Sequence, residues 1–389
     1  METSACVAPD EMSTTLVWWW TDECLVTLEP TLTNGVPRHM RIAQIAPLYE
    51  SVPPRAYGGT ERVVSYLTEE LVRAGHAVTL FASGDSVTSA ELVPVTKRSL
   101  RLDNRTVDAL AHHIVLVERA YQRAGEFDVM HFHVNYLHFP RSRYATVPHL
   151  TTLHGRLDIP DLLPLYQEFD DIPLVSISNA HRKPLPHANW LATIYHGLPR
   201  DLYRFEPGPG DYLACLGRLA PEKGVDHAIR IAVKAGMKLR IAAKMENRDY
   251  YEQTIKPLLN HSEVEFLGEI DEAAKQELLG RAAALIFPIE WPEPFGLVMI
   301  EAMACGTPTI AYRRGSIPEV IDDGQTGFIV DTMEEAIEAI HRIPELSRER
   351  CRHTFEQRFT ATRMAEQYVE VYERLVAQSA NTLAEEWHS

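Results

Sequence analysis

The sequence predicts a two-domain α/β protein in which each domain holds a parallel sheet covered by helices on both faces. With 389 residues, the chain is longer than one hydrophobic core usually supports, so two domains are the default expectation. From Met40 onward, short apolar runs alternate with amphipathic segments, which is typical of parallel sheets with crossover helices. Residues 199–210 hold three prolines and two glycines, and this segment is expected to join the domains.

Four segments are expected along the chain. Residues 40–199 form the N-terminal domain and residues 211–345 form the C-terminal domain. Residues 346–389 are expected to be mainly helical, because apolar positions recur there at helical spacing. Residues 1–39 precede the first strong strand pattern, and we interpret them as an extension outside the folded core. Their run Trp18-Trp19-Trp20 leaves a docking segment as the alternative.

Composition limits the class of function. The formal net charge of −16, from 38 basic and 54 acidic residues, argues against general nucleic-acid binding and against strong attraction to anionic membranes. The five cysteines are scattered, odd in number and without CxxC spacing, so we expect a reducing, cytoplasmic setting without disulfides or a zinc ribbon. No apolar run approaches the roughly 20 residues that span a bilayer, so no integral membrane segment is expected.

The expected strands are short apolar runs bounded by turn residues, and the expected helices carry apolar residues at intervals of three and four. In the N-terminal half the strands are residues 41–46, 77–82, 128–133, 150–153, 174–177 and 191–195. In the C-terminal half they are residues 212–216, 239–243, 264–267, 283–287, 309–312 and 328–330. The main helices are residues 61–74, with Thr60 as the expected cap, 106–123, 225–235, 296–305 and 347–377.

Gly58 and Gly59 stand between the first strand and the first helix. A glycine turn before a helix N-terminus can hold an anion, because backbone N–H groups point outward there. The spacing is not GxGxxG, so it does not indicate a dinucleotide site, and an oxidoreductase of that type is a distant alternative. A tight turn that needs a positive φ explains the two glycines equally well.

Three histidines stand at or near the ends of predicted strands. His131 and His133 fall two residues apart on one strand face, and no cysteine or carboxylate stands near them at metal-ligand spacing. We therefore expect them at the strand end, where open α/β sheets bind ligands, and we expect no metal there. His154 ends a strand directly before Gly155 and is suited to present an imidazole to a cleft, although an ordinary edge histidine fits as well.

Arg218 and Lys223 follow the first strand of the C-terminal half and precede a helix. A guanidinium fork and an ammonium group in this place can clamp a diphosphate. The alternative is a solvated basic pair, but cations near a helix N-terminus oppose the helix macrodipole. Gly268 and Ile270 follow a later strand, where backbone groups could contact the edge of a base.

The most informative stretch runs from Ile289 to Gly306. Two prolines predict a turn, and the apolar residues from Gly296 to Gly306 predict a short helix buried on most sides. Glu301 lies on a packed face of this helix, where a carboxylate is costly unless it is hydrogen-bonded. A helix N-terminus suits a phosphate, and the carboxylates of Glu293 and Glu301 suit hydroxyl donors, so we interpret the stretch as a nucleotide-sugar site. The alternative treats both glutamates as partly solvated residues.

Together these motifs resemble those of the retaining nucleotide-sugar glycosyltransferases of glycosyltransferase family 4. The resemblance covers Met40 to the C-terminus and rests most on Gly217-Arg218 to Lys223-Gly224 and on Glu293-Pro294-Phe295-Gly296 to Glu301. Gly58-Gly59 and Leu153-His154-Gly155 add to it. It implies the GT-B fold, in which two Rossmann-like domains face each other across a cleft and a C-terminal helix crosses back to the N-terminal domain.

The resemblance assigns the diphosphate and nucleoside contacts. Arg218 and Lys223 would neutralise the diphosphate, and Gly58 and Gly59 would approach it from the N-terminal domain. Glu301 would accept hydrogen bonds from the ribose hydroxyls. No metal ion and no other cofactor is implied.

The resemblance also assigns the sugar contacts. Glu293 would lie by the donor sugar, together with the backbone N–H groups of Phe295, Gly296 and Leu297. His154 would contact the sugar across the cleft. The residues expected at the reaction centre are therefore His154, Arg218, Lys223 and Glu293, without an assigned nucleophile.

The implied reaction moves a hexose, with glucose favoured, from a nucleoside-diphosphate sugar, with UDP favoured, to a hydroxyl of a small molecule or glycan, with retention of configuration. The stretch from residue 49 to 62 is similar to a bacterial subgroup that includes antibiotic-pathway and pterin glucosyltransferases. Residues 48–55 and 135–143 are expected to contact the acceptor. The alternatives are a GT-B-type disaccharide phosphorylase and a non-catalytic nucleotide-sugar-binding protein. Three acids are expected to be ordinary surface or loop residues: Asp85, Asp158 and Glu246.

Overall fold

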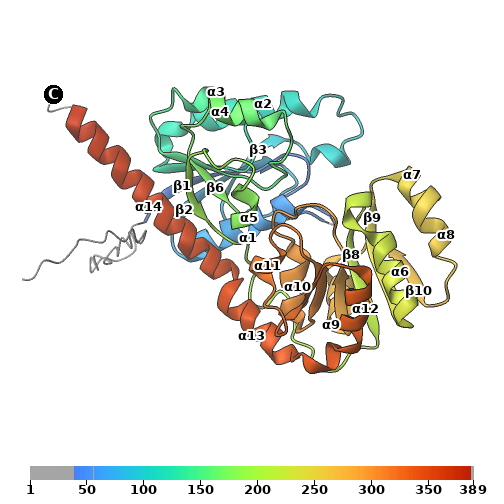
Figure 1. Cartoon of the computed structure of the whole chain (residues 1–389). Helices are drawn as coiled ribbons and strands as arrows, with labels where there is room; N and C mark the ends of the chain where they lie inside the picture. The colour runs from blue at the N-terminus through green and yellow to red at the C-terminus, as the bar shows by residue number, and fades with distance from the viewer. Residues whose placement is uncertain (1–38, 56, 387–389) are drawn as a thin grey trace, which may run out of the picture. The chain divides into compact units, whose positions relative to one another are not determined.

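The computed structural model describes residues 39–55 and 57–386, whose strands form two parallel sheets (Figure 1). The first sheet has the order β3-β2-β1-β4-β5-β6-β7, and the second has the order β10-β9-β8-β11-β12-β13. The strands of the first sheet are β1 (Arg41–Ile45), β2 (Ala77–Ser83), β3 (Glu91–Thr96), β4 (Val129–Phe132), β5 (His149–Thr152), β6 (Leu174–Ser176) and β7 (Trp190–Thr193). Those of the second are β8 (Tyr212–Leu219), β9 (Lys238–Met245), β10 (Val264–Gly268), β11 (Ala284–Phe287), β12 (Thr309–Tyr312) and β13 (Gly327–Val330).

The helices connect the strands in chain order and end in a long C-terminal pair. Helices that accompany the first sheet are α1 (Gly59–Arg73), α2 (Ala109–Gln122), α3 (Phe139–Ser142), α4 (Leu162–Glu168) and α5 (Asn179–Arg182). Those that accompany the second are α6 (Val225–Ala235), α7 (Arg248–Tyr250), α8 (Lys256–Leu258), α9 (Glu272–Gly280), α10 (Leu297–Cys305), α11 (Ile317–Val320) and α12 (Met333–His341). The last two helices are α13 (Arg348–Arg358) and α14 (Ala361–Glu386).

Helices cover both faces of each sheet, as alternating residues of the central strands show. Along β1, Ile42 packs in one core with α1 and α14, whereas Ala43 packs in another core with α2. Along β8, Ala214 packs with α9 and α10, whereas Leu213 packs with α6 and α12. Neighbouring strand residues point to opposite faces of a sheet, so the predicted α/β layering is confirmed in both halves.

Both sheets reverse their strand order beside the first strand of each half. β1 pairs with β2 on one side and β4 on the other, and β8 pairs with β9 and β11. The connections therefore leave these strands in opposite directions. In open α/β sheets a crevice forms outside the carboxyl ends of the strands at such a point, and ligands bind there.

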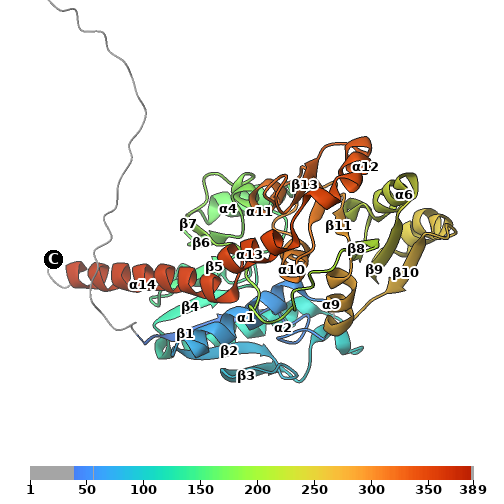
Figure 2. The ribbon, with the colours of Figure 1, turned by 90° about the horizontal axis from the view of Figure 1, so that it is seen from below.

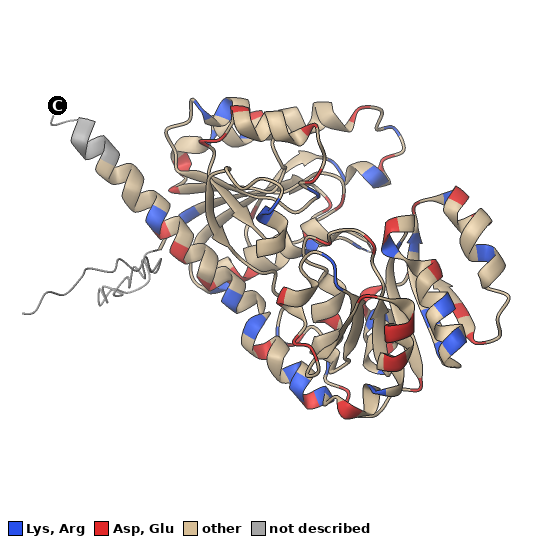
Figure 3. Cartoon of the chain, in the orientation of Figure 1, with Lys and Arg blue, Asp and Glu red and all other residues tan. Residues whose placement is uncertain are grey.

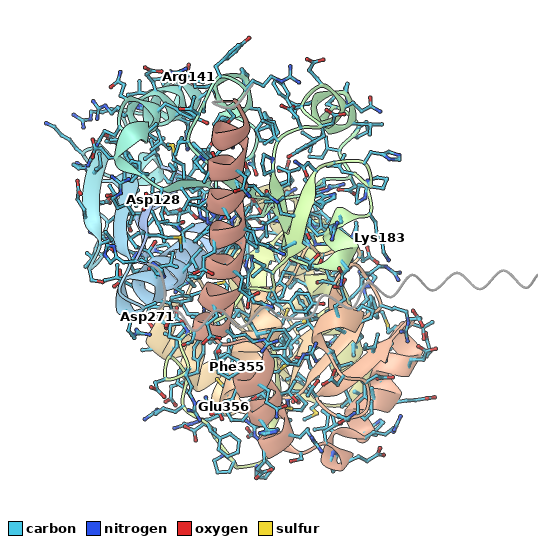
Figure 4. All side chains as sticks on the ribbon, turned by 90° about the vertical axis from the view of Figure 1, so that its left-hand side faces the viewer. Asp128, Arg141, Lys183, Asp271, Phe355 and Glu356 are labelled. Carbon is cyan, nitrogen blue, oxygen red and sulfur yellow. The ribbon has the colours of Figure 1, made fainter. Side chains whose placement is uncertain are left out.

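The C-terminal helices link the two halves of the chain. α13 packs against α10 beside the second sheet, whereas α14 packs against α1 and β4 of the first sheet. Figure 4 shows α14 continuing from α13, where Phe355 and Glu356 are labelled, over the first sheet, and Figure 2 shows the same course from below. The expected return of the C-terminal helix to the N-terminal half is confirmed.

The expected cap of the first helix is wrong. α1 begins at Gly59, and its N-cap is Gly58, which makes no side-chain capping bond and has a φ of 153°. A side chain at Gly58 would meet Pro54 Cβ at 2.7 Å. The turn therefore depends on the close approach of the Gly58 backbone to Pro54, and Thr60 lies inside the helix, two residues after the cap position.

The C-terminal tail, expected to be helical over residues 347–377, forms two helices, α13 and α14. The helix breaks at Phe359 and Thr360, because the backbone of Leu198 pairs there: its N–H donates to Phe359 O at 2.9 Å, and its carbonyl accepts from Ala361 N at 2.8 Å. Gly197 permits this approach, since a Cβ on it would lie 2.2 Å from Thr360 O. The break lies where the chain passes from one half to the other.

Three further details differ from the expectations. The edge strand β3 was not expected, because it contains Pro94, which lacks an N–H donor and is tolerated at a sheet edge. β8 runs three residues further than expected, to Leu219, so Arg218 lies within the strand. α2 begins at Ala109, and the side chain of Asp108 caps it by accepting from Leu110 N and Ala111 N.

Charged residues of both signs are mixed on the C-terminal helices. Figure 3 shows acidic and basic residues interspersed along α13 and the first part of α14. Within residues 39–55 and 57–386, no helix is both long enough and apolar enough to cross a bilayer. The proposed extension at residues 1–39 lies almost wholly outside the described residues.

Arg348 at the start of α13 ties this helix to the segment before β8 and to the end of α9. Its side chain donates to the carbonyl oxygens of Glu206, Gly280 and Ala282 at 2.6–2.7 Å, and the residue is 9% exposed. Burial lowers the pKa of its guanidinium. The carbonyl groups would lose a charged donor if this side chain were removed.

We expect Arg348→Met to lower the free energy of unfolding by about 3 kcal/mol, because buried carbonyl groups would be left without donors. Arg350→Met is the matched control, since Arg350 is exposed on the same helix. Urea denaturation of both variants would measure the difference. Equal stability of the two variants would contradict the structural role of Arg348.

Candidate active site between the two sheets

A cavity of about 480 Å³ lies where the carboxyl ends of strands from both sheets come together. The first half contributes residues that follow β1, β4 and β5, and the second contributes the ends of β8 and β9 and the N-terminus of α10. Most of the residues selected from the sequence line it: Gly58, Gly59, His154, Arg218, Lys223, Ile270, Glu293, Phe295, Gly296, Leu297 and Glu301. The structure therefore brings residues 243 positions apart in the chain into one site.

Gly268 is the exception. It ends β10 with a φ of 73° and does not line the cavity. The turn that it makes carries Glu269 and Ile270 into the cavity wall instead. The glycine thus has a conformational part in the site, because most side chains disfavour that φ.

The cavity wall has the opposite charge balance to the chain. Six basic side chains line it, Arg62, Arg101, Arg218, Lys223, Lys244 and Lys275, against four acidic ones, Glu61, Glu269, Glu293 and Glu301. The formal net charge of the whole chain is −16. A cationic excess in an acidic protein favours an anionic ligand at this place.

α10 builds one wall of the cavity. It starts after Gly296, with a φ of 80°, and ends at Gly306, with a φ of 84°, as the sequence predicts. Phe295, Gly296 and Leu297 line the cavity, so the first turn of the helix faces it. The first turn of any α-helix has N–H groups without intrahelical partners, and these suit an anion.

Glu293 is held in the turn before α10 rather than solvated. Its Oε2 accepts from Lys223 Nζ at 2.7 Å and from Trp291 Nε1 at 2.8 Å. Both side chains of the ion pair are largely buried, with 14% of Lys223 and 10% of Glu293 exposed. Lys223 Nζ also lies 4.8 Å from the centroid of the Trp291 ring. Trp291 was not selected from the sequence.

Arg218 reaches the cavity from β8 and is positioned by two carboxylates. It forms an ion pair with Glu246 and a second one with Glu222 at 3.3 Å. Glu246 is an exposed residue directly after β9, as expected for a surface acid, and it also pairs with this cavity-lining arginine. Asp85 and Asp158 do stand apart from the cavity: Asp85 accepts from Ser99, and Asp158 pairs with Arg156.

Glu301 is buried on α10, with 4% of the residue exposed. Its Oε1 accepts from Lys275 Nζ at 2.7 Å, and Lys275 lies 3.3 Å from Glu272 on the same helix, α9. Glu272 pairs in turn with Arg62 of α1, so the chain of charges crosses from one half to the other. Lys275 was missed in the sequence, because nothing local connects it to a glutamate 26 residues away.

The histidines selected from the sequence differ in whether they line the cavity. His154 and His133 line the cavity, whereas His131 is fully buried and bonded to Tyr372 and Thr152. The expected placement of His131 at a ligand site is therefore wrong. Burial lowers the pKa of His154 to about 3 and lowers the pKa of His133 well below its usual value, so both rings are neutral near pH 7.

No metal centre is evident among residues 39–55 and 57–386, where no group of three or more histidine, cysteine or acidic side chains is arranged to hold an ion. His131 and His133, the pair considered from the sequence, use their ring nitrogens in hydrogen bonds to protein groups. Positive charge in the cavity comes from arginine and lysine side chains.

The N-terminal half contributes a separate side of the cavity. Tyr49, Arg101 and Asn135 line it, and Asn135 has a positive φ of 53°. Glu50 accepts from Arg101 at 3.0 Å and lies 4.0 Å from Lys244 of β9. Tyr49 and Asn135 belong to the two stretches that the sequence suggests for an acceptor.

Two family profiles match the chain in succession. The family described as Glycosyltransferase Family 4 matches residues 57–205, and the family described as Glycosyl transferases group 1 matches residues 204–358. The first match spans β2 to β7, and the second spans β8 to β13.

Similar proteins of known sequence or structure have related descriptions. N-acetyl-alpha-D-glucosaminyl L-malate synthase of Bacillus anthracis is 40% identical over 128 residues, which are 31% of this chain and 33% of that protein. An uncharacterized glycosyltransferase of Methanocaldococcus jannaschii is 26% identical over 341 residues, covering 75% of this chain and 85% of that protein. The crystal structure of Anabaena HepE in complex with UDP and glucose shares the fold, with a TM-score of 0.68 at 21% identity, over 86% of this chain and 100% of that chain.

We expect Lys275→Met to lower the free energy of unfolding by about 3 kcal/mol, because it leaves the carboxylate of Glu301 buried without its cation. Lys256→Met is the matched control: Lys256 pairs with Glu252 at 2.6 Å, but both side chains are exposed. That control should change stability by less than about 0.5 kcal/mol. Chemical denaturation would measure both, and a Lys275→Met variant as stable as the control would contradict the importance of this buried pair.

Proposed function

Because the chain is a group 1 glycosyltransferase with the GT-B fold, we propose that it transfers a hexose from a nucleoside-diphosphate sugar to an acceptor hydroxyl with retention of configuration. UDP-glucose is the donor we favour. The observation that supports this proposal most is the cavity wall, which includes the first turn of α10, the buried carboxylates of Glu293 and Glu301, and the cations of Arg218, Lys223 and Lys275. HepE, which has the same fold, was crystallised with UDP and glucose, and this supports the choice of donor.

The diphosphate is proposed to bind between Arg218, Lys223 and the first turn of α10. The helix terminus supplies N–H donors, and the two side chains supply charge. Gly58 and Gly59 line the opposite wall, and Gly59 lies so near Leu297 that a Cβ on it would be 3.6 Å from that side chain. Glycines in this place let a diphosphate approach the backbone closely.

The nucleoside and the sugar are proposed to lie on either side of the diphosphate. Glu301 is buried and charged and is a strong acceptor for the ribose hydroxyls, and Lys275 holds it in place. Ile270, with the turn that Gly268 makes, is proposed to contact the base. Glu293 and His154 are proposed to contact the sugar from opposite sides of the cavity.

The proposed step is attack by the acceptor oxygen on the anomeric carbon from the face that the diphosphate leaves. The carbon–oxygen bond to the diphosphate breaks as the new glycosidic bond forms, and the acceptor proton passes to the departing phosphate oxygen. Positive charge develops on the sugar and negative charge on the diphosphate, so fixed cations lower the barrier. We propose that Arg218 and Lys223 neutralise the leaving group in place of a metal ion.

The acceptor is proposed to be a small molecule or glycan that enters from the N-terminal half. Tyr49 and Tyr57 are partly exposed there, at 42% and 37%, and aromatic faces suit sugar rings and other flat apolar groups. Arg101 and Asn135 add polar groups at the same wall.

We expect Arg218→Ala and Lys223→Ala each to lower kcat/KM for the donor by about a hundredfold, because the leaving diphosphate loses part of its charge stabilisation. Lys238→Ala, on an exposed residue at the start of β9, is the control and should retain full activity. Steady-state kinetics and circular dichroism would separate lost catalysis from lost folding. Near-normal activity in both variants would contradict the proposed binding of the diphosphate by Arg218 and Lys223.

We expect Glu301→Ala to weaken UDP binding by at least about tenfold, because it removes a charged hydrogen-bond acceptor from the ribose. The matched ligands are 2′-deoxy-UDP and 3′-deoxy-UDP. At least one of them should bind the original protein more weakly than UDP, and the variant should lose that discrimination. If calorimetry shows the same preference in the variant and in the original protein, Glu301 does not contact the ribose.

A further inference from the structure

An unbroken series of side-chain hydrogen bonds leads from the cavity wall to the C-terminal helix. It begins at His154, whose Nε2 lies 2.9 Å from Nδ1 of His133. Nε2 of His133 lies 2.8 Å from Oε1 of Gln44 on β1. The amide nitrogen of Gln44 donates to the hydroxyl of Tyr372 on α14 at 3.1 Å.

The series continues behind Tyr372. Its hydroxyl lies 2.7 Å from Nδ1 of His131, and Nε2 of His131 lies 2.7 Å from Oγ1 of Thr152. Tyr368, one turn before Tyr372 on α14, contacts the same Thr152 hydroxyl at 2.8 Å. The residues between the cavity and the helix are at most 2% exposed: Gln44, His131, His133, Thr152, Tyr368 and Tyr372.

Each link of this series needs one donor and one acceptor, so the protons are ordered along it. When the amide oxygen of Gln44 faces His133, that histidine must carry its proton on Nε2 and accept at Nδ1. His154 must then donate from Nε2 and hold a lone pair at Nδ1. If the Gln44 amide turned over, every proton would reverse, and His154 would carry its proton on Nδ1.

A buried atom at the end of the series selects between the two orders. Nδ1 of His154 is buried and has no hydrogen-bond partner among the described residues. A buried acceptor without a partner is tolerated better than a buried N–H without one. The order with the proton on Nε2 of His154 is therefore favoured.

We propose that Gln44, held by Tyr372 of the C-terminal helix, is a positioning residue that fixes the tautomer and the orientation of His154. The inference rests on the proposed function in one respect, namely that His154 contacts the donor sugar. Within it, α14 has a part in the active site although it does not line the cavity: the hydroxyl of Tyr372 bonds the Gln44 amide and holds it in place.

The burial of the histidines supports this role. Burial lowers the pKa of His133 and His131 well below the usual value, so neither ring gains a second proton near neutral pH. A neutral imidazole has one N–H and one lone pair, and only a neutral ring transmits the order from one neighbour to the next. A doubly protonated ring would donate on both sides and break the series.

Tyr372→Phe tests the proposal, because it removes the hydroxyl and keeps the packing of the ring. Tyr368→Phe is the matched control: it makes the same chemical change on the same helix, but the lost hydroxyl contacts only Thr152 in this series. Two-dimensional NMR of the full chain with ¹⁵N-labelled histidine reports which ring nitrogen of His154 carries the proton. We expect the proton on Nε2 in the original protein and in Tyr368→Phe, and a mixture of both tautomers in Tyr372→Phe.

Kinetic measurements distinguish a role of Tyr372 in positioning His154 from a general loosening of α14. Tyr372→Phe should lower kcat by about tenfold through misplacement of His154, with UDP affinity unchanged, and Tyr368→Phe should stay within about twofold of the original protein. Equal effects of the two variants, or an unchanged His154 tautomer in Tyr372→Phe, would overturn the proposal. Failure of the original protein to bind UDP would instead contradict the proposed function and would leave the NMR result to decide the proton order.

Discussion

The site depends on the pairing of two carboxylates that the fold buries beside α10. A buried carboxylate is strongly unfavourable unless a cation or hydrogen-bond donors surround it. Glu293 meets this requirement through Lys223 and Trp291, and Glu301 meets it through Lys275. Each pair joins another element of the cavity wall to α10 or to the turn before it.

The surrounding fold explains how these pairs are assembled. The second sheet supplies Arg218 from β8 and places the N-terminus of α10 beside it, while the first sheet supplies His154 and the glycines before α1. Contacts cross between the halves at several places, including Arg62 with Glu272 and Ser178 with the carbonyl of Pro294 at 2.7 Å. α13 and α14 continue this linkage, because one packs on each half.

The sequence predicts well those structural features that depend on residues close together in the chain. The bounds of α6 and β12, the glycine that ends α10 and the burial of Glu301 follow from local periodicity and turn chemistry. What it does not predict depends on distant contacts. Gln44 and Tyr372 are 328 residues apart, Lys275 and Glu301 are 26 apart, and the break after α13 arises from pairing with Leu198. No local pattern records such contacts, so the partners of the site residues required the structure.

If the proposed function is right, the cavity binds a nucleoside diphosphate through protein cations. Calorimetric titration of the purified chain with UDP, GDP and ADP, each with magnesium and with EDTA, would measure this binding. We expect micromolar binding of one nucleotide, with UDP favoured, and the same affinity in EDTA. Absence of binding by all three would contradict a nucleotide-sugar site, and binding that EDTA abolishes would contradict the assignment of the diphosphate charge to Arg218 and Lys223.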